Sequence, residues 1–169
     1  MEDYPEDLQN LYTEFGRTAE MAQVMEVEAG NLALTFVSLA FDPETITDDE
    51  RRFFRAVAED VNRRTFGYLL KEIRKIGNID EEIESSINMA LEKRNYLVHG
   101  FFRTHNLGIH SKEGREAMRR ELQEIYEALS RAHTILSLMT DTLNGVFGRP
   151  NISEEQARVL IKKGKRLVF

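Results

Sequence analysis

Three residues in the middle of the chain carry side chains that suit phosphodiester chemistry: Arg94, Asn95 and His99. Histidine titrates near neutral pH and can take a proton from a hydroxyl or return one. Arginine forks onto phosphate oxygens and stabilises charge that grows there, while asparagine can orient an imidazole or a ribose. Because the 2′-hydroxyl of RNA can serve as an internal nucleophile, this set predicts RNA cleavage that requires no metal ion and no cofactor.

The spacing of these residues decides which of them share a helix face. Five residues turn an ideal helix by about 500°, so Arg94 and His99 point about 140° apart. Asn95 and His99 lie four residues apart and share a face, with Glu92 and Phe102 close to the same stripe. Two copies of the helix paired across a two-fold axis would bring both sets into one cleft. The spacing therefore predicts a homodimer if the segment is a site.

The same three residues also have a purely structural interpretation. In it, Arg94 makes a surface ion pair, Asn95 is an ordinary helix residue, and His99 is a core histidine whose hydrogen bonds are satisfied. Residue types alone leave both interpretations open.

Further candidates for RNA contact follow the motif: Arg103, His105, His110, Arg115 and Arg119. The two histidines fall in a polar loop, and a metal site would need more converging ligands, so no metal is predicted. The last two arginines form a basic edge that could track a phosphate backbone, or simply a solvated helix face. The absence of cysteine excludes disulfides and thiolate zinc sites.

Charge is distributed unevenly along the chain. Residues 1–50 hold 13 acids and one base, a net of −12, whereas residues 51–169 hold 16 acids and 22 bases, a net of +6. Residues 91–120 contain seven bases against three acids. The overall charge of −6 argues against loose, charge-driven binding of nucleic acid, but it leaves room for a local basic site.

The elements that must position these residues are helices. Apolar residues recur every three or four positions, and no strand-like alternation of useful length occurs. The pattern predicts an all-α fold, an antiparallel bundle of about five helices in a single domain over residues 1–169. We expect an acidic long helix at 5–39, a motif-bearing helix at about 80–102, a long helix at about 112–143 and a short C-terminal helix at about 153–163. Between the first two, a capping box at Thr47–Glu50 starts a further helical stretch, and another runs over residues 65–76.

Targeting signals are missing from the sequence. The acidic start lacks the basic and apolar regions of a signal peptide. No apolar run approaches the roughly 18 residues that a membrane helix needs. We therefore expect a protein of the cytoplasm with no membrane contact.

The segment Ala90–Phe102 resembles the HEPN superfamily, whose signature is an arginine, a polar residue, a few variable residues and then a histidine. Arg94, Asn95 and His99 fit that signature, with four residues between the arginine and the histidine. The earlier segment Thr65–Leu70 is similar to the threonine–glycine–leucine helix start that often precedes the motif. The motif resemblance covers about residues 60–105.

This resemblance implies a fold, an activity and partners. HEPN proteins are helical bundles, and many are metal-independent ribonucleases that act as toxins or in phage defence at a cleft between two subunits. It implies His99 as general acid and base, Arg94 as the phosphate and transition-state contact, and Asn95 as a polar support. The implied partners are RNA, a second copy and an inhibitory protein. The alternative is a non-enzymatic, dimeric HEPN-like interaction or RNA-binding module, because some members have lost activity.

Overall fold

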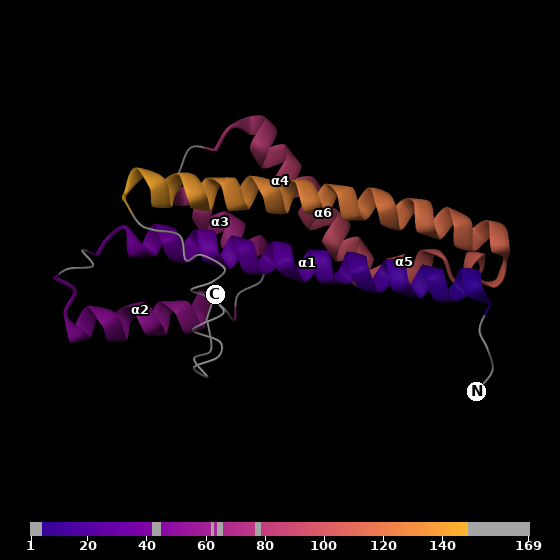
Figure 1. Cartoon of the computed structure of the whole chain (residues 1–169), viewed down its shortest axis with the longest axis horizontal. Helices are drawn as coiled ribbons and strands as arrows, with labels where there is room; N and C mark the ends of the chain where they lie inside the picture. The colour runs from indigo at the N-terminus through magenta and orange to yellow at the C-terminus, as the bar shows by residue number, and fades with distance from the viewer. Residues whose placement is uncertain (1–4, 42–44, 62, 64–65, 77–78, 149–169) are drawn as a thin grey trace. The chain divides into compact units, whose positions relative to one another are not determined.

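The computed structural model describes residues 5–41, 45–61, 63, 66–76 and 79–148. In those ranges every regular element is a helix and no strand occurs, which confirms the predicted all-α bundle. The elements in chain order are α1 (Glu6–Ser38), α2 (Asp48–Val61), α3 (Phe66–Ile76), α4 (Glu81–His99), α5 (Phe101–Thr104), the 3-10 turn η1 (Gly108–His110) and α6 (Lys112–Val146) (Figure 1). The C-terminal helix predicted at about 153–163 lies outside the described residues.

The chain groups into two compact units. We call the first the motif unit, because it contains the predicted site; it comprises Met1–Glu26 and Ile79–Thr134. The second unit comprises Val27–Asn78 and Ile135–Phe169. Both long helices, α1 and α6, pass from one unit into the other. The prediction of a single domain over residues 1–169 stays a prediction.

The motif unit has one apolar core, which α1, α4, α5 and α6 share. The members on α6 recur every three or four residues, and those on α1 and α4 lie at helical spacings of three, seven or eleven residues, so each of these helices turns one stripe inward. The buried core side chains are Leu11, Ala22, Met25, Ile87, Ala90, Leu97, Phe101, Met118, Leu122, Ile125, Leu129 and Ala132. Phe101 and Leu122 are completely buried, so the core reaches the segment that carries the motif.

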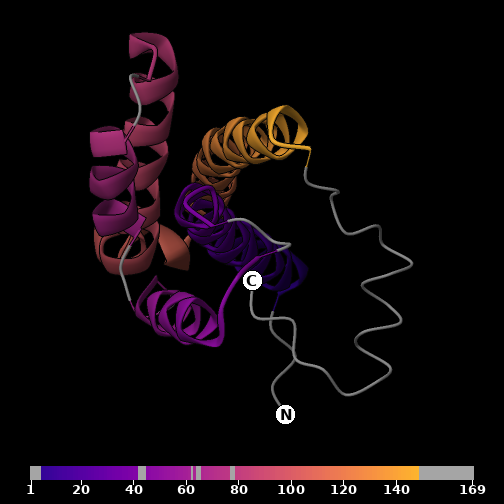
Figure 2. The ribbon, with the colours of Figure 1, turned by 90° about the vertical axis from the view of Figure 1, so that its left-hand side faces the viewer.

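Contacts between helices fix their directions within the motif unit. Asp7 pairs with Arg115, and further along both helices Glu14 pairs with Arg119, so α1 and α6 run parallel. The two coils lie next to each other in the end-on view (Figure 2). Glu26 pairs with Arg94 and Phe15 meets Phe101, so α4 and α5 run opposite to α1. The bundle therefore combines one parallel and one antiparallel helix pair.

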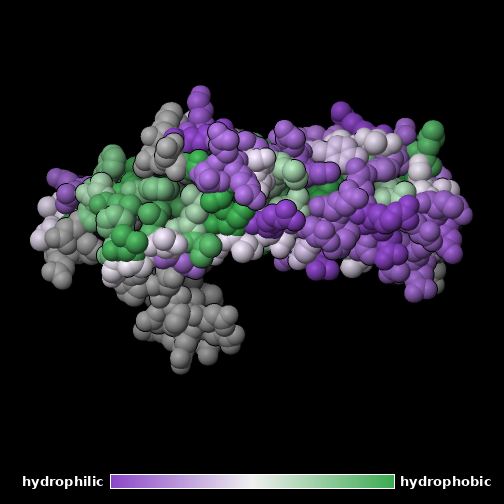
Figure 3. All heavy atoms as spheres, turned by 90° about the horizontal axis from the view of Figure 1, so that it is seen from above, coloured by the Kyte–Doolittle hydropathy of each residue, from purple (hydrophilic) through white to green (hydrophobic). Residues whose placement is uncertain are grey.

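The second unit contains α2, a helix that lies at the surface. The predicted capping box is present, because the Thr47 N–H donates to Glu50 at 2.7 Å and the Glu50 N–H donates to the Thr47 hydroxyl at 3.3 Å. None of the residues of α2 is buried, and Phe53 is 57% exposed. Hydrophobic side chains also gather over the last turns of α6, whereas hydrophilic ones cover its first turns (Figure 3).

Candidate functional site

Helix α4 carries the motif, and its start is set by local signals. Asp80 is the N-cap, and its carboxylate accepts the Glu82 N–H at 2.9 Å. Acidic residues in the first turn stabilise the helix, because they interact with the positive end of its dipole. Ile87, Ala90 and Leu97 are buried and anchor α4 in the core. This anchoring holds the backbone of Arg94 through His99 in a fixed register.

Gly100 separates α4 from α5, and its own N–H and carbonyl group are bonded to the two helices. The Gly100 N–H donates to the Tyr96 carbonyl at 2.7 Å, and the Thr104 N–H donates to the Gly100 carbonyl at 2.9 Å. A Cβ at Gly100 would lie 2.9 Å from a Tyr96 ring carbon and 3.2 Å from the Tyr96 carbonyl oxygen. The glycine therefore allows the Tyr96 ring to close over the backbone.

The stripe predicted from the helical spacing lies at the surface of α4 and α5. Glu92, Asn95, His99 and Phe102 are all exposed. Arg94 is off this stripe and only part-exposed, with 26% of its side chain accessible. The predicted separation of Arg94 from His99 on the helix surface is therefore confirmed.

Arg94 is engaged by two neighbours. Its guanidinium nitrogen Nη2 lies 2.7 Å from a carboxylate oxygen of Glu26 on α1, and its Nη1 donates to the side-chain oxygen of Asn95 at 3.1 Å. Glu26 is itself only 28% exposed. The ion pair predicted for Arg94 by the structural interpretation is thus present. It turns the arginine towards α1 and ties it to the next residue of the motif.

His99 lies in an open depression of about 560 Å³ at the end of α4. The lining consists of Phe15, Leu97, Val98, His99, Phe101, Phe102 and Arg103. His99 and Arg103 are exposed, and neither side chain makes a hydrogen bond or ion pair with any residue that the structure describes. The interpretation of His99 as a core histidine is therefore wrong, because its ring stands at the surface beside a cation.

The rim of this depression is apolar. Val98, which lies in the apolar part of the motif, is 53% exposed, and Phe102 is 37% exposed. Tyr12 of α1 is 45% exposed and its ring centroid lies 6.3 Å from that of Phe102. We call the exposed residues Asn95, Val98, His99, Phe102 and Arg103 the open face.

The two candidate histidines of the following loop differ in their surroundings. The His105 Nε2 lies 2.5 Å from a carboxylate oxygen of Glu121, and its ring centroid lies 4.9 Å from that of Phe101. Burial raises the pKa of the neighbouring Tyr96 phenol, which also contacts Thr104. These contacts fasten the loop to α6. His110 is exposed, and its side chain has no hydrogen-bond partner among the described residues.

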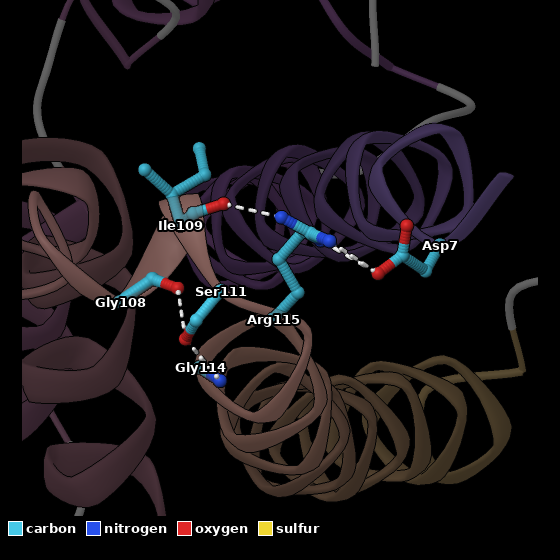
Figure 4. A network of polar contacts seen from close by, with 6 residues as sticks. All are labelled: Asp7, Gly108, Ile109, Ser111, Gly114 and Arg115. Atoms are coloured by element: carbon cyan, nitrogen blue, oxygen red, sulfur yellow. Dashed lines mark hydrogen bonds and ion pairs between the residues drawn. The ribbon is translucent and has the colours of Figure 1, made fainter. Parts of the chain in front are cut away.

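Arg115 and Arg119 bind carboxylates of α1. The Arg115 Nε and Nη2 both lie 2.7 Å from a carboxylate oxygen of Asp7, and its Nη1 donates to the Ile109 carbonyl at 2.9 Å (Figure 4). This ion pair holds the pKa of the Asp7 carboxyl below its usual range. Arg119 donates to one carboxylate oxygen of Glu14 at 2.9 and 2.5 Å. Their predicted contact with RNA stays a prediction.

We call this line of contacts between α1 and α6 the seam. It also includes the Arg17 guanidinium, which lies 4.3 Å from the ring centroid of Tyr126. At its start, the Gly114 N–H donates to the Ser111 hydroxyl at 3.1 Å (Figure 4). A Cβ at Gly114 would lie 2.0 Å from the Gly108 carbonyl oxygen, so only glycine fits this approach of the loop to α6.

Glu26 and Glu121 were not predicted as site residues, although Glu26 binds Arg94 and Glu121 binds His105. The charge pattern contained the relevant signal, because an acidic first third and a basic stretch at 91–120 are complementary. It indicates that the two segments attract each other, but it cannot pair individual residues. Among the described residues no group of three or more His, Asp or Glu side chains is placed to hold a metal ion.

No protein-family model, no curated protein and no solved structure matches this chain. Membership of the HEPN superfamily therefore stays a prediction that depends on the motif. In the described ranges, none of the helices combines the length and apolar character needed to cross a membrane.

Proposed function

We propose that this protein is a metal-independent endoribonuclease of HEPN type, which acts at a cleft between two copies of the chain. The observation that carries the proposal is the open His99 ring, which shares one exposed stripe with Asn95 and one depression with Arg103. A general acid and base must reach its substrate, and a histidine at the surface beside a cation meets that condition.

The proposed reaction needs only the RNA and this chain. A His99 imidazole takes the proton of a ribose 2′-hydroxyl, and the 2′-oxygen forms a bond to phosphorus. The bond from phosphorus to the 5′-oxygen breaks, and the 5′-oxygen receives a proton from the His99 of the second copy. The products are a 2′,3′-cyclic phosphate and a 5′-hydroxyl, and the cation beside His99 stabilises the charge on the phosphate oxygens.

A second copy would cover the apolar rim of the open face. Val98 and Phe102 project from it with large exposed fractions, and such exposed apolar side chains near a polar site are typical of protein contacts. We place the activity in the cytoplasm, as a toxin or in phage defence, under the control of an inhibitory protein partner. In this proposal His105, Arg115 and Arg119 are bound by carboxylates of the chain and take no part in cleavage, whereas His110 remains a candidate RNA contact.

The test is a cleavage assay with purified protein and unstructured RNA in excess chelator. We expect cleavage with 2′,3′-cyclic phosphate ends, no cleavage of RNA methylated at the 2′-oxygen, and a loss of about 10²–10⁴-fold in rate for His99→Ala. His133→Ala is the matched control, because His133 is a histidine of α6 that belongs to none of the candidate site residues. The proposal is wrong if wild type cleaves nothing or if His99→Ala cleaves as well as wild type.

The second candidate function is a non-enzymatic, dimeric interaction or RNA-binding module. The Glu26–Arg94 ion pair favours it, because the positive charge of the motif arginine is already neutralised inside the chain. It predicts that Arg94→Ala and His99→Ala leave the biological function intact. Light scattering tests the dimer that both candidate functions assume, since a strict monomer at micromolar concentration contradicts a shared cleft.

A further inference from the structure

Resting on the proposed function, we infer that Arg103 contacts the scissile phosphate. Glu26 and Arg94 act as a positioning pair that fixes Asn95. This assignment differs from the roles expected from the motif, in which Arg94 contacts the phosphate. It adds Glu26, a residue of α1, to the site.

The contacts of Arg94 direct its charge away from the open face. The guanidinium Nη2 lies 2.7 Å from a Glu26 carboxylate oxygen, and Nη1 donates to the Asn95 side-chain oxygen at 3.1 Å. Both members of the ion pair are about three-quarters covered, so the pair is less screened than a fully exposed one. Breaking it to reach a phosphate would leave the Glu26 carboxylate without its cation.

The same contacts determine what Asn95 offers to a substrate. An asparagine amide has one acceptor oxygen and an NH₂ group with two donors. Because the oxygen accepts from Arg94, the NH₂ group is the part left for other partners, and it belongs to the exposed stripe that also holds His99. A fixed NH₂ donor next to an acid–base histidine suits a phosphate oxygen or a ribose hydroxyl.

Arg103 has the properties that Arg94 lacks. It follows His99 by four residues, on the other side of the Gly100 junction between α4 and α5. Both side chains line the same depression. Within the described residues the Arg103 guanidinium has no hydrogen-bond or ion-pair partner, so binding a phosphate breaks no existing contact.

Salt dependence of binding tests the assignment independently of cleavage. We would measure the affinity for a single-stranded oligonucleotide methylated at every 2′-oxygen over a range of salt concentrations. Each phosphate contact to a single strand contributes about 0.7 to the slope of log affinity against log salt. Arg103→Gln should lower the slope by about 0.7 and weaken binding about fivefold near 0.1 M salt, while Arg103→Lys keeps the slope.

The positioning pair should behave differently. Arg94→Lys and Arg94→Gln should leave the slope and KM within twofold of wild type, because neither variant removes a phosphate contact. Both should lower kcat by about 10²-fold, since neither a lysine ammonium nor a neutral glutamine amide can hold Glu26 and Asn95 together as the planar guanidinium does. Glu26→Ala should lower kcat in the same way. Glu14→Gln is the matched control, because it removes the carboxylate of another ion pair between α1 and a second helix and should leave kcat unchanged.

The outcomes separate this inference from the proposed function. The inference is overturned, and the nuclease survives, if Arg94→Gln lowers the slope while Arg103→Gln does not. It is also overturned if Glu14→Gln lowers kcat as much as Glu26→Ala. If the slopes change as expected but no RNA is cut, the phosphate contact stands and the nuclease is wrong. If the oligonucleotide does not bind, both are wrong.

Discussion

The seam and the open face both contain arginines, but they use them in opposite ways. In the seam, Arg115 and Arg119 bind carboxylates of α1, and Arg17 lies over an aromatic ring. On the open face, Arg103 has no partner among the described residues and stands beside His99. Arg94 belongs to neither, since it lies near the motif but binds Glu26. An arginine is available for phosphate only where α1 has no carboxylate facing it.

The largest effect on stability should come from the glycine that lets the loop approach the seam. Gly114→Ala places a Cβ 2.0 Å from a backbone oxygen of Gly108, which cannot move aside as a side chain can. We expect a loss of about 3 kcal/mol in the free energy of unfolding, measured by urea denaturation. Gly16→Ala in α1 is the control, because its Cβ meets nothing within 4 Å. That change should stabilise the protein by about 1 kcal/mol. Equal stabilities for the two variants would contradict the tight approach.

The next largest effect should come from Arg115. Arg115→Met keeps most of the buried stem but removes the bonds to Asp7 and to the Ile109 carbonyl. Hydrogen bonds of charged groups of this kind contribute about 2 kcal/mol, so the unfolding free energy should fall by about that amount. Arg120→Met, at an exposed position of the same helix, should change it by less than about 0.5 kcal/mol. A small effect at both positions would mean that the seam does not stabilise the fold.

A smaller effect is expected at the junction behind the open face. Gly100→Ala brings a Cβ to 2.9 Å from the Tyr96 ring and 3.2 Å from the Tyr96 carbonyl oxygen. The clash outweighs the gain in helix propensity by about 1 kcal/mol. The added Cβ also changes the position of His99 relative to Arg103. The free energy of RNA binding should therefore weaken by more than the free energy of unfolding does. Calorimetry and the salt-dependent binding assay measure the two quantities, and unchanged affinity would argue against a site at this junction.

The smallest effect concerns acid stability. Arg115 lowers the pKa of Asp7, so the folded carboxyl binds its proton less readily than the unfolded one. The stabilising contribution is therefore complete above the unfolded pKa and is lost as the pH falls below about 4. Asp7→Asn should make the urea midpoint less dependent on pH in that range. Glu50, whose pKa is lowered by the Thr47 N–H and hydroxyl, should still contribute, so the dependence should shrink and not disappear.

The helices could be predicted because their signals are local. Asp80 caps α4 and the Thr47–Glu50 box starts α2, as their residue types indicate. Helix α6 buries an apolar stripe from Met118 to Leu136, because a repeated spacing of three and four residues has only one inward face. Predicted and observed bounds of α1, 5–39 and Glu6–Ser38, differ by one residue at each end.

The partners of the charged residues could not be predicted, since they depend on which helices meet. Arg115 and Asp7 are 108 residues apart, and no local pattern links them. The Tyr12 position shows the same limit. Its spacing fits the apolar stripe of α1, yet it is 45% exposed, because the core follows Leu11 and Ala22 instead. Helical geometry alone predicted that Arg94 and His99 lie on different sides of the helix. The ion pair between Glu26 and Arg94 could be found only in the folded structure, because the two residues lie on different helices.

The central claim is that the open face serves function while the seam serves stability, and one paired measurement tests it most directly. His99→Gln and Arg115→Met are each assayed for unfolding free energy and for RNA cleavage per folded molecule. We predict that His99→Gln abolishes cleavage at wild-type stability, and that Arg115→Met lowers stability by about 2 kcal/mol at wild-type cleavage per folded molecule. If His99→Gln cleaves normally, or if Arg115→Met loses cleavage without losing stability, the division of roles is contradicted.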